Sequence, residues 1–324
     1  MEKTRVGVVG VGYLGQFHAE KYAKMKGVEL AGVVDIDFAR AREIAKRYRS
    51  QPFSHHPEIL SRVQAVSIAV PTPLHHAIAR DFLEKGVDVL LEKPISTTLQ
   101  EADELIELAE SHRRVLQIGH LERFSGPLLA LEGVVQNPMF IESNRLGPFL
   151  LRGTEVDVVL DLMIHDIDII LSWVPSKVKW FHAVGIPVLT SRIDIANVRV
   201  EFENGCTANL TASRVSREKM RKIRLFQPTG YLSIDFLRQK AILAGKKEEE
   251  GKKGLPGIFV KRFPVKKVDP LKMEIESFLQ CVRTRGTPRV SGRDGRRALE
   301  LALQIVQSIQ DLVARRLTDG PPQG

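Results

Sequence analysis

Residues 6–15 read Val-Gly-Val-Val-Gly-Val-Gly-Tyr-Leu-Gly, an apolar run that ends in a glycine-rich turn. A second apolar run, residues 30–34, is followed at once by Asp35. This order of strand, glycine turn, helix, strand and carboxylate is typical of a dinucleotide-binding βαβ unit. In such a unit the amino end of the helix binds the pyrophosphate, and the carboxylate accepts hydrogen bonds from the ribose hydroxyls.

The three glycines of the turn have separate expected tasks. Gly10 permits a tight turn, Gly12 lets the backbone approach a phosphate, and Gly15 lets the helix pack closely on the strand. The turn follows a strand, and the acid lies about 20 residues beyond the last glycine, as the fingerprint requires. The context therefore favours a nucleotide site over an ordinary glycine-rich turn.

Asp35 also predicts which dinucleotide binds. A carboxylate at this position accepts hydrogen bonds from a free 2′-hydroxyl and repels a 2′-phosphate, so NAD is expected rather than NADP. Arg40 and Arg42 follow closely in the sequence and could soften this preference. They are also consistent with a solvated helix face.

Length and composition indicate a two-domain globular protein. The chain has 324 residues, more than one hydrophobic core usually supports. Its first strand begins too early for a signal peptide, and the most apolar helical stretch, residues 156–174, carries acids that exclude a membrane span. The two cysteines, Cys206 and Cys281, have no partner at metal-ligand spacing. We expect a cytoplasmic protein with no disulfide framework and no membrane contact.

The net charge of +9 raises the question of nucleic acid. Residues 246–267 hold eight lysines and arginines against three glutamates, and so contribute +5. Glycines and a proline in this segment predict a solvated, mobile loop. No nucleic-acid recognition motif accompanies the charge, so we expect a small anionic substrate rather than nucleic acid as the partner.

Up to residue 121 the sequence alternates strand and helix patterns. This predicts an α/β domain over residues 1–121, an NAD-binding Rossmann domain with a doubly wound parallel sheet. The expected strands are 5–9, 30–34, 65–69, 87–91 and 115–118. The expected helices lie near 14–26, 38–48, 74–85 and 98–112.

From about residue 137 longer alternating strands replace this pattern. Asn204-Gly205 predicts a hairpin turn, and residues 228–230 predict a second turn. Residues 122–318 are therefore expected to form an α+β domain for substrate binding and oligomerisation, with a large, mostly antiparallel sheet. Its expected strands are 140–145, 177–184, 196–202, 207–212, 221–227 and 231–235, and its helices lie near 157–173, 271–284 and 293–316. The tail, residues 319–324, is expected to be disordered.

Two motifs outside the glycine turn could carry chemistry. Lys93 lies in Glu92-Lys93-Pro94, directly after a predicted strand, where doubly wound sheets bind ligands. It could polarise a substrate oxygen or help remove its proton, although a lone surface lysine before a proline is an alternative. Asp161 and His165 lie four residues apart, on one face of a predicted helix, and an imidazole suits proton removal near neutral pH. The alternative is a satisfied helix histidine beside a carboxylate, and no second His or Cys completes a metal site.

These residues carry a resemblance. GVGYLG with Asp35, AVPTPLHH at 69–76, EKP at 92–94 and DLMIHDID at 161–168 resemble the Gfo/Idh/MocA family of sugar and polyol oxidoreductases. The resemblance implies catalytic roles for Lys93, Asp161 and His165. It also implies a cofactor site made from residues of these motifs: Gly10, Gly12, Tyr13, Leu14, Gly15, Asp35, Pro71, Thr72, His75, Glu92 and Lys93.

Within that family, residues 117–128 and 211–226 are similar to members that oxidise UDP-N-acetylhexosamines at carbon 3. The implied reaction converts UDP-N-acetylglucosamine to its 3-keto derivative, which an aminotransferase would use in lipopolysaccharide biosynthesis. The implied substrate-binding residues are His120, Arg123, Phe124 and Arg214. For the two arginines, structural ion pairing is an equal alternative to contact with the pyrophosphate.

Two other functions stay open at this point. One is a dehydrogenase of a free sugar or polyol of the inositol or glucose type, and the other is an NAD-binding regulator without turnover. The presence of Lys93, Asp161 and His165 favours an enzyme over a regulator. A homodimer or homotetramer is also expected, because an antiparallel sheet with one open face is well suited to symmetric packing.

Overall fold

The computed structural model describes residues 3–150, 153–250 and 256–318. The chain divides into two compact units. The first contains residues 1–124 and 269–299, and the second contains residues 125–268 and 300–324. Each unit is described by itself.

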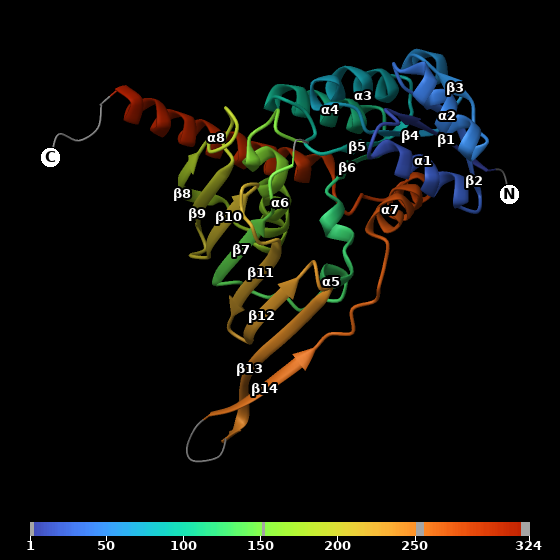
Figure 1. The fold of residues 1–324 in the computed structure, drawn as a ribbon. Helices are drawn as coiled ribbons and strands as arrows, with labels where there is room; N and C mark the ends of the chain where they lie inside the picture. Colours follow the sequence, from blue (N-terminus) through green and yellow to red (C-terminus); the bar gives the residue numbers. More distant parts are fainter. Residues whose placement is uncertain (1–2, 151–152, 251–255, 319–324) are drawn as a thin grey trace. The chain divides into compact units, whose positions relative to one another are not determined.

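The first unit is built on a parallel sheet with strand order β3-β2-β1-β4-β5-β6 (Figure 1). Its strands are β1 (Thr4–Val9), β2 (Val28–Val34), β3 (Pro52–Phe53), β4 (Ala65–Ile68), β5 (Asp88–Glu92) and β6 (Leu116–Gly119). The helices between them are α1 (Gly15–Lys24), α2 (Phe38–Tyr48), α3 (His75–Glu84) and α4 (Leu99–Ser111). The predicted Rossmann sheet is thus confirmed. The two-residue strand β3 was not predicted, because it is too short to show a pattern.

Helix α7 (Pro270–Thr284) belongs to this first unit, although the sequence analysis assigned it to the second domain. Its apolar face supplies Leu271, Ile275 and Phe278 to the core that also holds Val6 and Tyr22. The helix packs on α1, on β5 and on the short turn of helix at Leu121–Phe124. Hydrophobic burial therefore ties a late part of the sequence to the first sheet.

The second unit is built on a mostly antiparallel sheet with order β14-β13-β12-β11-β7-β10-β9-β8. Only the β7–β10 pair is parallel among the described strand pairs of this sheet. The strands are β7 (Phe140–Leu146), β8 (Val178–Ile186), β9 (Ile195–Phe202), β10 (Thr207–Ser213), β11 (Met220–Gln227), β12 (Gly230–Asp235), β13 (Lys240–Glu250) and β14 (Pro256–Arg262). This confirms the predicted sheet, including the hairpin at Gly205, whose φ is +85°.

Helices of the second unit lie against its sheet. A π-helical turn, Val159–Met163, packs on β10 and leads into α6 (Ile164–Trp173). The helix α5 (Gly126–Leu129) is a single turn, and α8 (Gly292–Thr318) runs across the division between the units. The expected helix near 157–173 is therefore present, but its first turn is wider than an α-helix.

The prediction of a mobile loop at 246–267 is wrong for most of this segment. Strands β13 and β14 form an antiparallel hairpin in which Leu243 is opposite Lys261 and Lys246 is opposite Ile258 (Figure 1). Backbone hydrogen bonds make this pairing, and lysines are common on the outer strand of a sheet because they discourage further pairing. Composition therefore did not reveal the strands. Residues 251–255 and the predicted tail, 319–324, lie outside the described residues.

Within the described ranges, no helix combines the length and the apolar composition that crossing a membrane requires.

Candidate active site

The glycine turn of the first unit has the expected geometry. Gly10 has a φ of +80°, and a Cβ there would lie 2.7 Å from the Ala69 carbonyl oxygen. A Cβ on Gly15 would lie 1.7 Å from the Gly10 carbonyl oxygen. Apart from the adjacent residues of the chain, no described residue has an atom within 4 Å of a Cβ position at Gly12, so a phosphate can approach the backbone there.

Asp35 links the end of β2 to this turn. Its carboxylate accepts hydrogen bonds from the backbone N–H groups of Val11 (2.9 Å) and Asp37 (3.0 Å). Arg40 donates from Nε to the Val11 carbonyl oxygen at 3.1 Å and pairs with Glu43. Arg40 is thus part of the wall of the nucleotide region rather than of a purely solvated face.

A cavity of about 240 Å³ lies beside Asp35. It is lined by residues that follow β1, β2, β3 and β4, among them Gly10, Gly12, Ile36, His55 and Pro71. Its mainly apolar wall and the acceptor at Asp35 fit an adenosine half of a dinucleotide. The residues present therefore fit NAD.

His75 connects the loop after β4 with the loop after β5 through hydrogen bonds. It is 1% exposed, and its Nδ1 and Nε2 lie 2.8 Å and 2.9 Å from the carbonyl oxygens of Pro94 and Val70. Burial lowers the pKa of the imidazole below its ordinary value. The two carbonyl contacts favour the charged ring and raise the pKa, but they offset only part of this effect. Because the side chain is buried and both ring nitrogens face backbone carbonyls, His75 holds together the loops after β4 and β5. The expected cofactor contact of His75 stays a prediction.

Lys93 follows the last residue of β5 and is half buried. The neighbouring Glu92 pairs with His18 of α1, with His18 Nε2 3.1 Å from Glu92 Oε1. The Lys93–Pro94 peptide bond is cis. Lys93 therefore lies beyond the carboxyl end of a strand, at the edge of the sheet that also carries the glycine turn.

The predicted substrate contacts after β6 differ in exposure. His120 and Phe124 are 1% and 2% exposed, so their side chains pack inside the protein. The expected ligand contacts of both residues stay predictions. Arg123 is half buried, and its guanidinium lies 3.4 Å from the Arg289 carbonyl oxygen. Of the three, Arg123 has the side chain best able to reach a ligand.

In the second unit, most acids near the π-helical turn have structural partners. Asp157 accepts a hydrogen bond from the Ile193 backbone N–H at 2.8 Å, and Asp166 forms a buried two-point ion pair with Arg145. Asp161 and His165 are half buried, whereas the residues around His165 are buried. The two predicted side chains are thus partly accessible polar groups on this helix.

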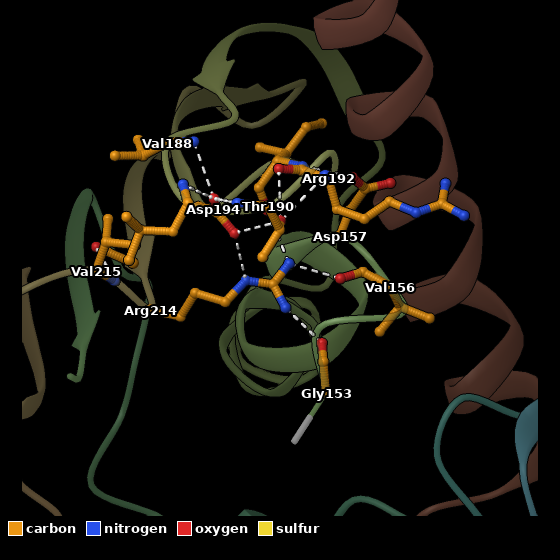
Figure 2. A network of polar contacts seen from close by, with 12 residues as sticks. Gly153, Val156, Asp157, Val188, Thr190, Arg192, Asp194, Arg214 and Val215 are labelled. Carbon is orange, nitrogen blue, oxygen red and sulfur yellow. Dashed lines mark hydrogen bonds and ion pairs between the residues drawn. The ribbon is translucent and has the colours of Figure 1, made fainter. Parts of the chain in front are cut away.

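Arg214 lies in a buried network of the second unit (Figure 2). Its Nε lies 3.0 Å from Asp194, and its terminal nitrogens donate to the carbonyl oxygens of Gly153, Val156 and Ile193. Burial alone would raise the pKa of Asp194, but three backbone N–H groups and the Thr190 hydroxyl lower it to about 2. These contacts occupy the guanidinium and favour structural ion pairing for Arg214, while its expected substrate contact stays a prediction.

The network has a link to Asp161. Gly153 has a φ of +79°, and a Cβ there would lie 2.8 Å from Asp161 Oδ2. Arg214 therefore holds the backbone segment that lies against the Asp161 carboxylate.

Two residues near Lys93 in the first unit, His18 and Glu274, were not predicted from the sequence. Both are buried and lie close to Glu92. They are far apart in the sequence and belong to no motif, so only the packing of α1 and α7 reveals them.

The chain matches known families over most of its length. Residues 4–120 match the oxidoreductase family with an NAD-binding Rossmann fold, GFO/IDH/MocA, and residues 126–233 match the GFO/IDH/MocA C-terminal domain. It is 38% identical to UDP-N-acetylglucosamine 3-dehydrogenase of Acidithiobacillus ferrooxidans over 97% of this chain and 100% of that protein.

Two further similarities extend this finding. A solved structure of the Acidithiobacillus dehydrogenase superposes with a TM-score of 0.91, covering 96% of this chain and 99% of that one. Myo-inositol 2-dehydrogenase of Thermotoga maritima is 25% identical over 95% of this chain and 96% of that protein.

Replacing Asp35 tests the nucleotide region. Asp35→Ala removes the acceptor for the ribose and frees the Val11 N–H, so we expect the Kd for NAD to rise about 10- to 100-fold, as for the loss of a hydrogen bond to a charged group. Calorimetric titration with NAD and NADP measures this. Glu29→Gln, on an exposed position of β2, is the matched control. An unchanged Kd in Asp35→Ala would contradict the assignment.

Replacing Arg214 tests its structural role. Arg214→Met leaves the buried Asp194 without its ion-pair partner, and we expect a loss of about 3–5 kcal/mol in the free energy of unfolding. Scanning calorimetry measures this, with the exposed Arg217→Met as control. A stable Arg214→Met protein with weakened substrate binding would instead support direct contact with substrate.

Proposed function

Because the chain belongs to the GFO/IDH/MocA family of NAD-binding oxidoreductases, we propose that it oxidises UDP-N-acetylglucosamine at carbon 3 to the 3-keto nucleotide sugar. The observation that carries the substrate is the 38% identity, over essentially both full lengths, to a UDP-N-acetylglucosamine 3-dehydrogenase. The inositol dehydrogenases are more distant relatives.

Residues of the first unit would hold the cofactor. The N–H groups of the turn at Gly10–Gly15 and the amino end of α1 suit the pyrophosphate, and Asp35 suits the ribose. Pro71 and Thr72 follow β4, Glu92 is the last residue of β5 and Lys93 follows it, so these residues would lie toward the nicotinamide end. When bound, NAD accepts a hydride from the carbon that is oxidised.

Lys93, Asp161 and His165 would act on the substrate hydroxyl. The imidazole of His165 would take the hydroxyl proton, because its ordinary pKa lies near neutrality. The Lys93 ammonium would stabilise the negative charge that develops on the oxygen, and Asp161 would orient His165 or the sugar. Their half-buried positions support this, since a partly water-free site strengthens such interactions.

Arg123 would bind the substrate pyrophosphate. A guanidinium matches phosphate oxygens in a two-point geometry, and Arg123 lies just beyond β6 at the ligand edge of the sheet. With Arg214 occupied elsewhere, Arg123 is the predicted arginine that remains for this task.

The second candidate is a dehydrogenase of a free polyol. The 25% identity to a myo-inositol 2-dehydrogenase over nearly the whole chain is the observation that favours it. Such a substrate has no pyrophosphate and would leave Arg123 without a role.

The wider setting is part of the same proposal. The enzyme would work in the cytoplasm, since Cys206 and Cys281 are buried free thiols rather than a disulfide. A partner aminotransferase would consume the ketone for lipopolysaccharide biosynthesis. A homodimer or homotetramer would form through the open face of the second sheet, where β8 exposes Trp180 and Ile186.

The catalytic assignment predicts a specific loss. Lys93→Met and His165→Ala should each lower turnover by about 10²- to 10⁴-fold, the usual contribution of a general acid–base group, while NADH binding survives. Steady-state kinetics and NADH titration measure the two effects. Lys85→Met and His112→Ala, both at exposed positions, are the matched controls. Turnover near that of the wild type would remove the residue from the mechanism.

A substrate panel tests the proposal directly. Nucleotide sugars and free sugars are incubated with enzyme, NAD and an oxidant that regenerates NAD, because formation of the ketone is unfavourable by itself. We expect a product two hydrogens lighter than UDP-N-acetylglucosamine by mass spectrometry. Activity on inositol or glucose with none on UDP sugars would support the polyol candidate, and NAD binding without any turnover would support a regulator.

A further inference from the structure

Three ionisable side chains meet inside the first unit, beneath the turn that carries Lys93. They are His18 from α1, Glu92 from the end of β5 and Glu274 from α7, and one nitrogen or oxygen of each lies within 4.8 Å of the others. His18 and Glu274 are 1% and 0% exposed. Nothing in the proposed mechanism uses Glu274.

The charges in this cluster do not balance if every group is ionised. His18 contacts Glu92 at 3.1 Å, whereas neither carboxyl oxygen of Glu274 has a hydrogen-bond partner among the described residues. Two carboxylates this close, one of them fully buried, cannot both stay charged with one imidazole between them.

The other groups around the cluster do not supply a partner for Glu274. Tyr22 of α1 is buried and hydrogen-bonded to Ser67, and Gln117 of β6 donates its amide to the backbone carbonyl of Glu274 rather than to its side chain. The charge of Glu92 also acts on the buried His75, whose own pKa is lowered by burial. Glu274 is therefore the member that must be neutral.

We propose that Glu274 carries a proton at neutral pH and acts as a positioning residue, whose neutral carboxyl lets Glu92 keep the charge that pairs with His18 and so fixes the turn at Lys93. The role of Lys93 in this inference rests on the function proposed above. The protonation of Glu274 does not, since it concerns only the interior of the first unit.

The geometry shows how the cluster would act on Lys93. Glu92 is paired with Gly119 of β6, and a Cβ on Gly119 would lie 3.0 Å from the Glu92 carboxyl carbon. The carboxylate is thus confined between Gly119 and His18. A second negative charge on Glu274 would repel it, and the adjacent residue, Lys93, would move with it.

The pH dependence of stability follows from the proton. Burial, with a further contribution from Glu92, raises the pKa of Glu274 well above its usual value. Its stabilising effect is complete below the unfolded pKa near ~4.3 and is lost as pH rises through the folded pKa. Between the unfolded and the folded pKa of Glu274, the unfolding constant of the wild type should grow about tenfold more per pH unit than that of a variant without this acid.

Glu274→Gln is the informative variant, because it keeps the shape and removes the titration. Glu276→Gln, two residues away on the exposed face of α7, is the matched control. Infrared difference spectra at pH 7 should contain a protonated-carboxyl band in the wild type and in Glu276→Gln, and this band should be missing from Glu274→Gln. Denaturant unfolding should be measured from pH 5 to 8. With each pH unit, the unfolding constants of the wild type and of Glu276→Gln should grow about tenfold more than that of Glu274→Gln.

A second variant covers the case in which Glu274→Gln does not fold. Glu92→Gln removes the neighbouring charge, so the carboxyl band of Glu274 should disappear at a lower pH than in the wild type. An absent band in the wild type at pH 7, or identical pH dependence in all proteins, would overturn the inference. So would a stoichiometric divalent metal in the purified wild type that Glu274→Gln lacks.

Turnover supplies the functional readout. In the wild type, turnover should fall at alkaline pH as Glu274 becomes charged. Glu274→Gln cannot acquire this charge, so its pH–turnover profile should lack this fall. The same fall in both proteins would overturn the link to Lys93. If no substrate is turned over, the proposed function fails, while the spectra and unfolding data still decide the protonation of Glu274.

Discussion

The close approach of α1 to the first glycine turn is the constraint on which the first unit depends. A side chain at Gly15 would overlap the Gly10 carbonyl, so the helix can start where it does only with glycine at that position. The same contact orients the amino end of α1 toward the cofactor region and places His18, one turn later, against Glu92. Nucleotide binding and the position of Lys93 are thus set by one piece of backbone packing.

Local signals predicted the fold well. The strands and helices of the Rossmann sheet have clear periodicity, and the hairpin at Gly205 has its turn residues, so both could be predicted without tertiary information. Strands β13 and β14 could not, because their pairing depends on backbone hydrogen bonds at a sheet edge where charged side chains are tolerated. The placement of α7 was not predicted either, because the apolar face of an amphipathic helix does not indicate which core it will cover.

The candidate site was only partly predictable for related reasons. Asp35 and Lys93 follow strands, and their location comes from the general rule for parallel sheets. The role of Arg214 depended on Asp194 and on three backbone carbonyls, which only the folded chain brings together. Glu274 lies 182 residues after Glu92 in the sequence, so its contact with that residue leaves no local pattern.

The late position of α7 bears on how the chain is made. Residues 125–268 of the second unit are synthesised before α7 leaves the ribosome, so most of that unit can fold while the nucleotide-binding unit still lacks part of its core. Until then the apolar side of α1, including Tyr22, is open to non-native contacts. The growing chain would therefore gain its ability to retain a dinucleotide only near the end of translation, after most of the second unit exists.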